Sequence, residues 1–278
     1  MTARKKTRAA ALLIVWILLM GLCAGCAGSE EPSPSPSTSP SSSPDPLPEP
    51  SRTPDPTPVP TINIAGQTVP VDVTELDLHD KGLSDISAIQ SLTLLWSLQL
   101  HNNQISDLTP LMPLTGLARL WLYSNQISDI TPLAALTNLV ELRMWNNQIS
   151  DLTPLKSMNN LALLWLGSNQ ISDLTPLGSL TKLSQLSLGS NQISDISPLK
   201  TLTKLTALTL DKNQISDLAP LAPLTGLESL GLSDNKIGDV TVLKSLTNLK
   251  RVFLSGNPLT QVQIDDLQAA LPDCEISF

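Results

Sequence analysis

The chain has 278 residues, and 41% of them are hydrophobic but only 3% are aromatic, so its apolar side chains are mainly aliphatic. The net charge of −8 argues against a nucleic acid partner, because phosphate binding requires an excess of Lys and Arg. With two His and three Cys in the chain, few side chains are available for a zinc site or a catalytic triad, and we expect no cofactor.

The first 25 residues have the features of a signal peptide. A basic start at residues 4–8 precedes an apolar run at 9–22, which is short for a transmembrane helix. Ala24-Gly25 then precedes Cys26, and this ending resembles a bacterial lipobox, in which the Cys carries a lipid and becomes the mature N-terminus. The pattern predicts export and a lipid anchor at Cys26. The alternative is ordinary secretion with cleavage after Ala24.

Residues 26–60 are expected to form a Pro/Ser-rich disordered tether. From residue 27 to 60 the chain contains 12 Pro, 9 Ser and 3 Thr, with no apolar periodicity that could build a core. In a polyproline II conformation, at ~3.1 Å per residue, such a segment would reach up to ~100 Å. We expect a stalk that carries the folded part, and a Pro-rich recognition motif is the alternative.

From residue 76 to 259 one pattern of 22 residues recurs. Two apolar residues separated by one position precede an Asn in each copy, as in Leu120-Trp121-Leu122 before Asn125. The pattern L-x-x-L-x-L-x-x-N-x-L is the leucine-rich repeat signature. A further copy that begins at Leu76 has Lys81 in place of the Asn, as suits a terminal repeat, which gives about nine repeats. The repeated Asn residues are Asn103, Asn125, Asn147, Asn169, Asn191, Asn213, Asn235 and Asn257.

Each unit predicts a short strand, a turn and a helical turn. The paired Leu residues point to one side of a strand, so stacked units form a parallel sheet with strands ~4.8 Å apart and the Leu side inward. The Asn is expected to bond neighbouring loop backbone. Thr109 before Pro110 fits a helix N-cap followed by Pro at the first helical position. About seven apolar residues per unit point inward, each worth roughly 1.5–3 kcal/mol on burial.

Both ends of the array are predicted to be capped. Residues 61–75 alternate in polarity and predict an N-terminal β cap, which we expect to form a β edge over the first repeat. In the C-terminal cap, residues 260–278, Thr260 and Gln263 match a capping box and open a short helix. Cys274, Ile276 and Phe278 alternate as a last strand folded onto the core, so Cys274 is expected to be a buried hydrophobic side chain.

Residues 61–278 resemble the 22-residue repeats of bacterial internalins. The resemblance rests on N-x-I-x-D-[LI]-x-P-L, as in 103–111, 125–133 and 169–177. It implies an α/β leucine-rich repeat solenoid with a parallel sheet on the concave face and short 3-10 turns on the convex face. It also implies recognition of a protein or peptide on the concave side rather than catalysis. A C-terminal wall-sorting motif is not seen, so we expect attachment through the N-terminus.

Variation between the repeats concentrates at outward strand positions. Four of the six aromatic residues between positions 76 and 262 fall on three neighbouring strands, with charged side chains beside them. An exposed cluster of aromatic and Arg side chains is typical of a binding hot spot, so truncating these rings should cost binding much and the fold little. The alternative is plain β propensity, which would scatter aromatics over all strands. The predicted ligand-binding residues are His101, Arg119, Trp121, Tyr123, Glu141, Arg143, Trp145 and Trp165.

Two other patterns in the sequence could suggest metal sites. His79 and His101 share one column, with Glu75 and Asp77 near them, and form a weak candidate for a metal ion. We assign no metal there, because two His and a carboxylate meet easily by chance. An Asp repeated from Asp85 to Asp239 could suggest calcium, but Asp commonly bonds local backbone in turns, and we favour that role.

The sequence therefore predicts a non-catalytic binding protein, exported to a bacterial cell surface and anchored to the membrane by a lipid at Cys26. We expect a monomer that recognises a protein or peptide and binds no nucleic acid. Two alternatives remain open, namely a carbohydrate-binding module that uses the same aromatic patch and a structural spacer. An enzyme is least favoured, because no catalytic constellation is visible.

Overall fold

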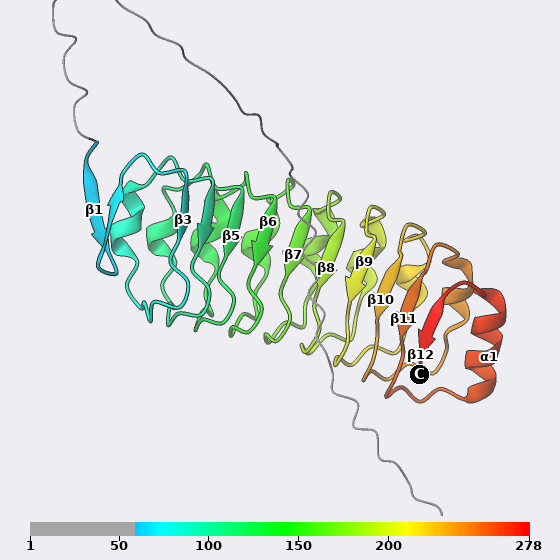
Figure 1. The fold of residues 1–278 in the computed structure, drawn as a ribbon. Coiled ribbons are helices and arrows are strands. Elements are labelled where there is room, and N and C mark those ends of the chain that lie inside the picture. The colour runs from blue at the N-terminus through cyan, green and yellow to red at the C-terminus, as the bar shows by residue number, and fades with distance from the viewer. Residues whose placement is uncertain (1–58) are drawn as a thin grey trace, which may run out of the picture. The chain divides into compact units, whose positions relative to one another are not determined.

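The computed structural model describes residues 59–278. The predicted signal peptide, Cys26 and all but the last two residues of the predicted tether lie outside the described residues. Within 59–278, no helix has the length and apolar character needed to cross a membrane. This part of the chain is a curved array of repeats, with strands along one face and short helical turns behind them (Figure 1).

One face of the array is a parallel sheet, which contains ten strands within residues 59–278. The first nine strands pair with an offset of 22 residues, so that Leu98 lies opposite Leu120, and the last strand pairs with an offset of 24. This confirms the register predicted from the repeat. The strands are β3 (Glu75–Asp77), β4 (Ser97–Gln99), β5 (Arg119–Trp121), β6 (Glu141–Arg143), β7 (Leu163–Trp165), β8 (Gln185–Ser187), β9 (Ala207–Thr209), β10 (Ser229–Gly231), β11 (Arg251–Phe253) and β12 (Glu275–Ser277).

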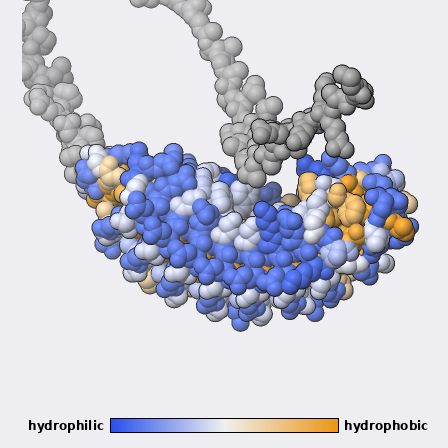
Figure 2. Space-filling view, turned by 90° about the horizontal axis from the view of Figure 1, so that it is seen from below, coloured by the Kyte–Doolittle hydropathy of each residue, from blue (hydrophilic) through white to orange (hydrophobic). Residues whose placement is uncertain are grey.

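The opposite face carries a 3-10 turn between successive strands from β3 to β11, as predicted. The turns are η1 (Ser87–Ser91), η2 (Thr109–Leu111), η3 (Thr131–Ala135), η4 (Thr153–Leu155), η5 (Thr175–Ser179), η6 (Ser197–Thr201), η7 (Ala219–Leu221) and η8 (Thr241–Ser245). Neighbouring strands are about 4.8 Å apart, whereas the helical turns behind them need more room side by side, so the array curves with the strands on its concave side. Figure 2 shows the curved outline of the array.

The repeated Asp opens each turn, which confirms the backbone-bonding role. Asp107 Oδ1 accepts a hydrogen bond from the Thr109 N–H at 2.8 Å, and all eight Asp residues from Asp85 to Asp239 do the same two positions ahead. The prediction of Thr109 as N-cap is therefore wrong by one position. Thr109 is the first residue of η2, and no side-chain hydrogen bond comes from the cap residue Leu108. The Asp already satisfies the first free N–H, so the Thr hydroxyl is not needed.

The repeated Asn residues link successive turns of the solenoid. Asn125 Nδ2 donates to the carbonyl oxygens of Leu100 and Leu122, each at 3.0 Å. Its Oδ1 accepts from the N–H of Ile105 in the preceding repeat at 3.0 Å. These bonds satisfy loop groups that would otherwise be buried without partners, as the sequence predicted. In the first repeat, the N–H of Lys81 donates to Asn103 Oδ1.

A single aliphatic core runs the length of the array. In one unit the seven inward side chains are each at most 1% exposed, and they are Leu117, Leu120, Leu122, Ile127, Ile130, Leu133 and Leu136. This matches the predicted count. Because each layer is covered only by the layers beside it, the two ends need separate covers.

At the N-terminal end, β1 (Thr61–Ile64) and β2 (Gln67–Pro70) form an antiparallel hairpin. The predicted N-terminal β cap is thus a hairpin that forms a two-stranded sheet of its own. Ala65 and Gly66 both have positive φ, 53° and 77°, which is the geometry of a tight hairpin turn. Ile64 and Val69 are buried and face the first repeat.

At the C-terminal end, α1 (Gln261–Ala270) begins with the predicted capping box between Thr260 and Gln263. Cys274 is 4% exposed, as expected, and burial raises the pKa of its thiol. Phe278 was predicted to face the core but is 48% exposed, because β12 ends at Ser277 and leaves Phe278 beyond the last pairing. The face in Figure 2 is mainly hydrophilic, and its apolar colour gathers towards the two ends of the array.

Candidate binding face

Seven of the eight predicted ligand-binding residues come together on the concave side of β5, β6 and β7, and His101 follows β4 beside them. The parallel register aligns Trp121 with Arg143 and Arg143 with Trp165. Tyr123 and Trp145 lie two residues further along their strands and form a second column. Because strands of a parallel sheet are about 4.8 Å apart, side chains of one column are close enough for flat groups to stack.

In the first column, Arg143 lies between two tryptophan rings. Its guanidinium carbon is 4.4 Å from the Trp121 ring centroid and 4.3 Å from the Trp165 ring centroid. We call these three residues the Trp–Arg–Trp stack. Each cation–π contact contributes about 0.5–1 kcal/mol at an exposed site and about 2 kcal/mol when desolvated. The stack therefore ties three adjacent repeats together on their outer side.

The second column is a ladder of rings, formed by His79, His101, Tyr123 and Trp145. The ring centroids of His79 and His101 are 4.7 Å apart, those of His101 and Tyr123 are 4.2 Å apart, and those of Tyr123 and Trp145 are 3.6 Å apart. We call this column the aromatic ladder. Trp145 also meets Trp165 in a tilted contact at 5.6 Å, which joins the two columns. Burial raises the pKa of Tyr123.

The rings lie on the solvent-facing side of the sheet, as predicted, but they cover one another. Trp121, Tyr123, Trp145 and Trp165 are half-buried, and His101 is only 7% exposed. The physical reason is the repeat itself, which places each ring one strand spacing from the next, so neighbours cover each other's faces. Truncating one ring therefore removes contacts within the fold as well as surface.

Glu141 connects the charged residues of the site. Trp121 Nε1 donates to Glu141 Oε1 at 2.9 Å. Arg143 Nε lies 2.5 Å from the same oxygen, without the alignment of a hydrogen bond, and Arg119 Nε is 3.9 Å from Oε2. The sequence predicted that the charged residues flank the rings, but it did not show that one carboxylate binds both a ring and a guanidinium.

One further aromatic residue escaped the sequence analysis. The guanidinium carbon of Arg119 lies 4.7 Å from the Trp96 ring centroid. Trp96 directly precedes β4, which begins at Ser97, so the alternation of side chains along a strand did not place it on the concave face. The sequence feature that could have identified Trp96 is its spacing of 23 residues from Arg119, one more than the repeat length.

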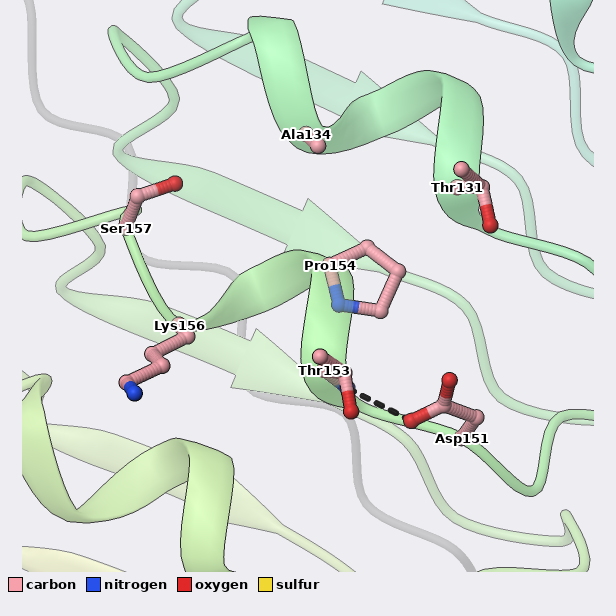
Figure 3. Close-up of a pocket in the computed structure, with 7 residues that line it drawn as sticks. All are labelled: Thr131, Ala134, Asp151, Thr153, Pro154, Lys156 and Ser157. Atoms are coloured by element: carbon pink, nitrogen blue, oxygen red, sulfur yellow. Dashed lines mark hydrogen bonds between the residues drawn. The ribbon is translucent and has the colours of Figure 1, made fainter.

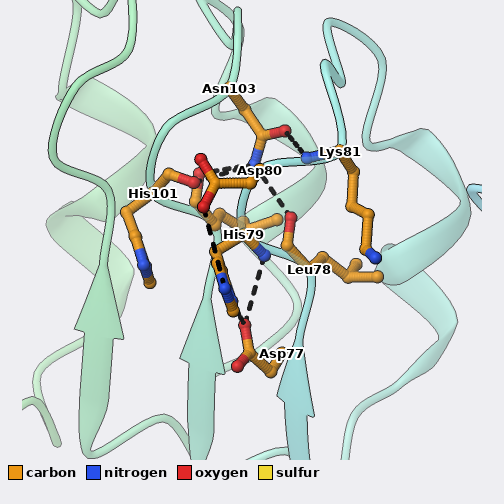
Figure 4. Close-up of polar contacts among 8 residues, drawn as sticks. Asp77, Leu78, His79, Asp80, Lys81, His101 and Asn103 are labelled. Atoms are coloured by element: carbon orange, nitrogen blue, oxygen red, sulfur yellow. Dashed lines mark hydrogen bonds and ion pairs between the residues drawn. The ribbon is translucent and has the colours of Figure 1, made fainter.

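His79 and His101 stack rather than converge on a shared metal position (Figure 4). The two rings are parallel within 2°, so their nitrogen lone pairs lie in separate parallel planes. His79 Nδ1 is 2.6 Å from Asp77 Oδ1, and this contact already occupies one nitrogen. Within the described residues, no group of three or more His, Cys, Asp or Glu side chains could hold a metal ion.

The convex side carries an open hollow of about 620 Å³ between η3 and η4 (Figure 3). Its lining residues are Thr131, Ala134, Asp151, Thr153, Pro154, Lys156 and Ser157. The carboxylate that lines it, Asp151, accepts the capping bond from the Thr153 N–H. The hollow is thus made of the turn framework that every repeat shares.

The model of the family described as leucine-rich repeats (2 copies) matches residues 97–135, 115–157, 137–179, 159–201, 181–223 and 225–269. The chain therefore belongs to the leucine-rich repeat family, and its solenoid is of the internalin type. Proteins with this fold are typically non-enzymatic interaction scaffolds. No curated protein matches the chain.

Solved internalin structures are similar to this chain. An internalin (inlF) from Listeria monocytogenes is 35% identical, with a TM-score of 0.66 over 70% of this chain and 64% of that one. An internalin C2 from Listeria monocytogenes is 39% identical, with a TM-score of 0.65 over 71% of this chain and 87% of that one. The chain thus spans a little under two thirds of the first of these structures and most of the second.

A plant receptor shows a similar solenoid with a bound partner. The leucine-rich repeat ectodomain of the membrane receptor kinase GASSHO1/SCHENGEN3 from Arabidopsis thaliana is 25% identical, with a TM-score of 0.60 over 68% of this chain and 24% of that one. That ectodomain was solved in complex with CASPARIAN STRIP INTEGRITY FACTOR 2.

Proposed function

We propose that this protein is a non-catalytic binding protein that recognises a protein ligand through the concave face centred on β5, β6 and β7. The observation that carries the proposal is the gathering of Trp121, Arg143 and Trp165 on three adjacent strands. Binding hot spots are enriched in Trp, Tyr and Arg and cluster near the centre of an interface. The similar plant ectodomain in complex with a partner supports the same use of the fold.

A protein ligand is favoured over a sugar by the way the rings are used. Carbohydrates stack on open aromatic faces, whereas the faces of Tyr123 and Trp145 are turned to each other at 3.6 Å. Trp121 and Trp165 both turn a face to Arg143. The edges of the rings and the charged groups of Arg119 and Glu141 then remain for contact, and these suit the polar rim and apolar centre of a protein interface.

Site-specific photocrosslinking tests the concave face. A photoreactive amino acid at Gln99, beside Trp121 on the concave sheet, should capture a partner from extracellular or cell-surface protein fractions. The same amino acid at Lys156, on the convex hollow, is the matched control. Equal capture at both positions, or capture only at Lys156, would place the ligand elsewhere. A glycan array that binds the wild-type protein but not the Trp121→Ala variant would favour the carbohydrate alternative.

We further propose display at a bacterial surface through a lipid on Cys26, with residues 26–60 as the tether. The support is the sequence alone, namely Ala24-Gly25-Cys26 after a basic and apolar leader. Metabolic labelling with a clickable fatty acid should mark the wild-type protein and leave Cys26→Ala unlabelled and released from the membrane. Cys23→Ala is the control, and unchanged labelling of Cys26→Ala would contradict the anchor.

A further inference from the structure

His101 occupies an unusual position within the aromatic ladder. Its side chain is buried at 7% exposure, and its Nδ1 has no hydrogen-bond partner among the described residues. One face of its ring stacks on His79 and the other on Tyr123. A neutral imidazole is stable in this environment, because an uncharged ring can stack on its neighbours without a counter-ion.

The charged groups around His101 leave a protonated ring without a partner of its own (Figure 4). From the preceding repeat, Asp77 Oδ1 is 2.6 Å from His79 Nδ1, and Asp80 Oδ2 is 3.7 Å from His79 Nε2. From the following repeats, Tyr123 packs on the ring and Arg143 adds a positive charge. Both carboxylates are therefore engaged with His79, and a proton on His101 would face a second imidazole and a guanidinium.

We propose that His101 is a proton-operated switch of the binding face, neutral and stacked near neutral pH, and charged and unstacked in acid. Unstacking releases Tyr123 from one side and loosens the ladder that leads to Trp145 and the Trp–Arg–Trp stack. The consequence for ligand binding rests on the proposed function, since acid would then weaken recognition. The switch itself is a property of the ladder and does not require a ligand.

The direction of the effect follows from burial. The pKa of His101 is lowered, mainly by burial and next by the charge of His79. Asp77 and Asp80 raise it in part. The folded protein thus binds a proton at His101 less readily than the unfolded chain does. Stability from the neutral ring is fully present above the ordinary His pKa of about 6.5 and is lost as the pH falls through the lowered value.

The chain supplies its own probe, because Tyr123 is its single tyrosine. Ring-labelled tyrosine gives one NMR signal in the full-length protein, and stacking on Trp145 should displace that signal upfield at neutral pH. As the pH falls below the ordinary His pKa of about 6.5, the signal should lose this displacement when His101 takes up its proton. Its midpoint should coincide with the titration of the His101 ring, which is resolved easily because the chain has two His.

Three variants decide the outcome. His101→Phe keeps a flat ring that cannot take a proton, and His101→Gln keeps a neutral side chain if the Phe variant does not fold. Both should make the Tyr123 signal independent of pH over this range. His79→Phe should move the midpoint upward, since it removes a neighbouring positive charge and frees Asp77. A wild-type signal that does not move, or a His101→Phe signal that still moves, would overturn the switch. Because no ligand is present, either result leaves the proposed binding function untouched.

Discussion

Replacing Arg143 tests whether the Trp–Arg–Trp stack stabilises the solenoid. Arg143→Ala removes two cation–π contacts, at 4.4 and 4.3 Å, and the ion pair with Glu141. The Arg143 side chain is 21% exposed, so each contact should lie between the exposed and the desolvated limits of about 0.5 and about 2 kcal/mol. The free energy of unfolding should fall by about 2 kcal/mol, since a partly exposed ion pair adds little.

Urea unfolding followed by circular dichroism measures this change. Arg143→Lys should lose most of the same stability, because an ammonium group has no planar face to stack between two rings. Arg251→Ala, at an exposed position on β11, is the matched control and should change little. A double-mutant cycle with Trp165→Ala should give a coupling of about 1 kcal/mol. If Arg143→Ala unfolds at the same urea concentration as Arg251→Ala, the stack does not stabilise the fold.

Three other predictions follow from single residues. Asn125→Ala leaves the Ile105 N–H without a partner, whereas the Leu100 and Leu122 carbonyls keep the side-chain amides of the neighbouring Asn residues. It should lower the free energy of unfolding in urea by about 1–3 kcal/mol, whereas exposed Gln126→Ala should not. Lys212 has φ 55°, a conformation that is costly for a side chain, so Lys212→Gly should stabilise by up to about 1 kcal/mol; a lower melting temperature would contradict this. Burial raises the pKa of Asp211, so the free energy of unfolding falls as the pH rises and this carboxyl loses its proton. Asp211→Asn should therefore have a higher melting temperature than wild type at neutral pH. The difference in melting temperature should close in acid, and a difference that is constant with pH would disagree.

The framework of the fold was predictable because one rule repeats. A 22-residue spacing fixes the strand register, the inward Leu positions and the role of the Asn, and each was confirmed. The eight Asp residues were assigned to turns for the same reason. The ends were harder, since a cap has no second copy to compare. The hairpin at Ala65-Gly66 and the exposed Phe278 both lie where the repeat no longer applies.

The composition of the candidate site could also be read from the sequence, but its internal contacts could not. Alternation along a strand predicts that Trp121 lies on the concave face of the sheet, but it does not predict which neighbouring side chain the ring packs against. Stacking depends on side-chain torsions across three strands, and the positions of Arg143 and His101 between rings depend on it. The same holds for positive φ at positions such as Ser124 and Lys212, where the residue type gives no warning.

We propose that the concave face of β5, β6 and β7 binds a protein ligand. The most direct measurement is the affinity of the photocaptured partner for Trp121→Ala and Trp165→Ala, beside Ser187→Ala and Thr209→Ala from the same column, with the unfolding midpoint of each sample. We expect each Trp variant to stay folded, with reduced stability, and to lose about 2 kcal/mol or more of binding free energy, while the Ser and Thr variants bind as wild type does. Trp variants that remain folded and keep wild-type affinity would contradict it.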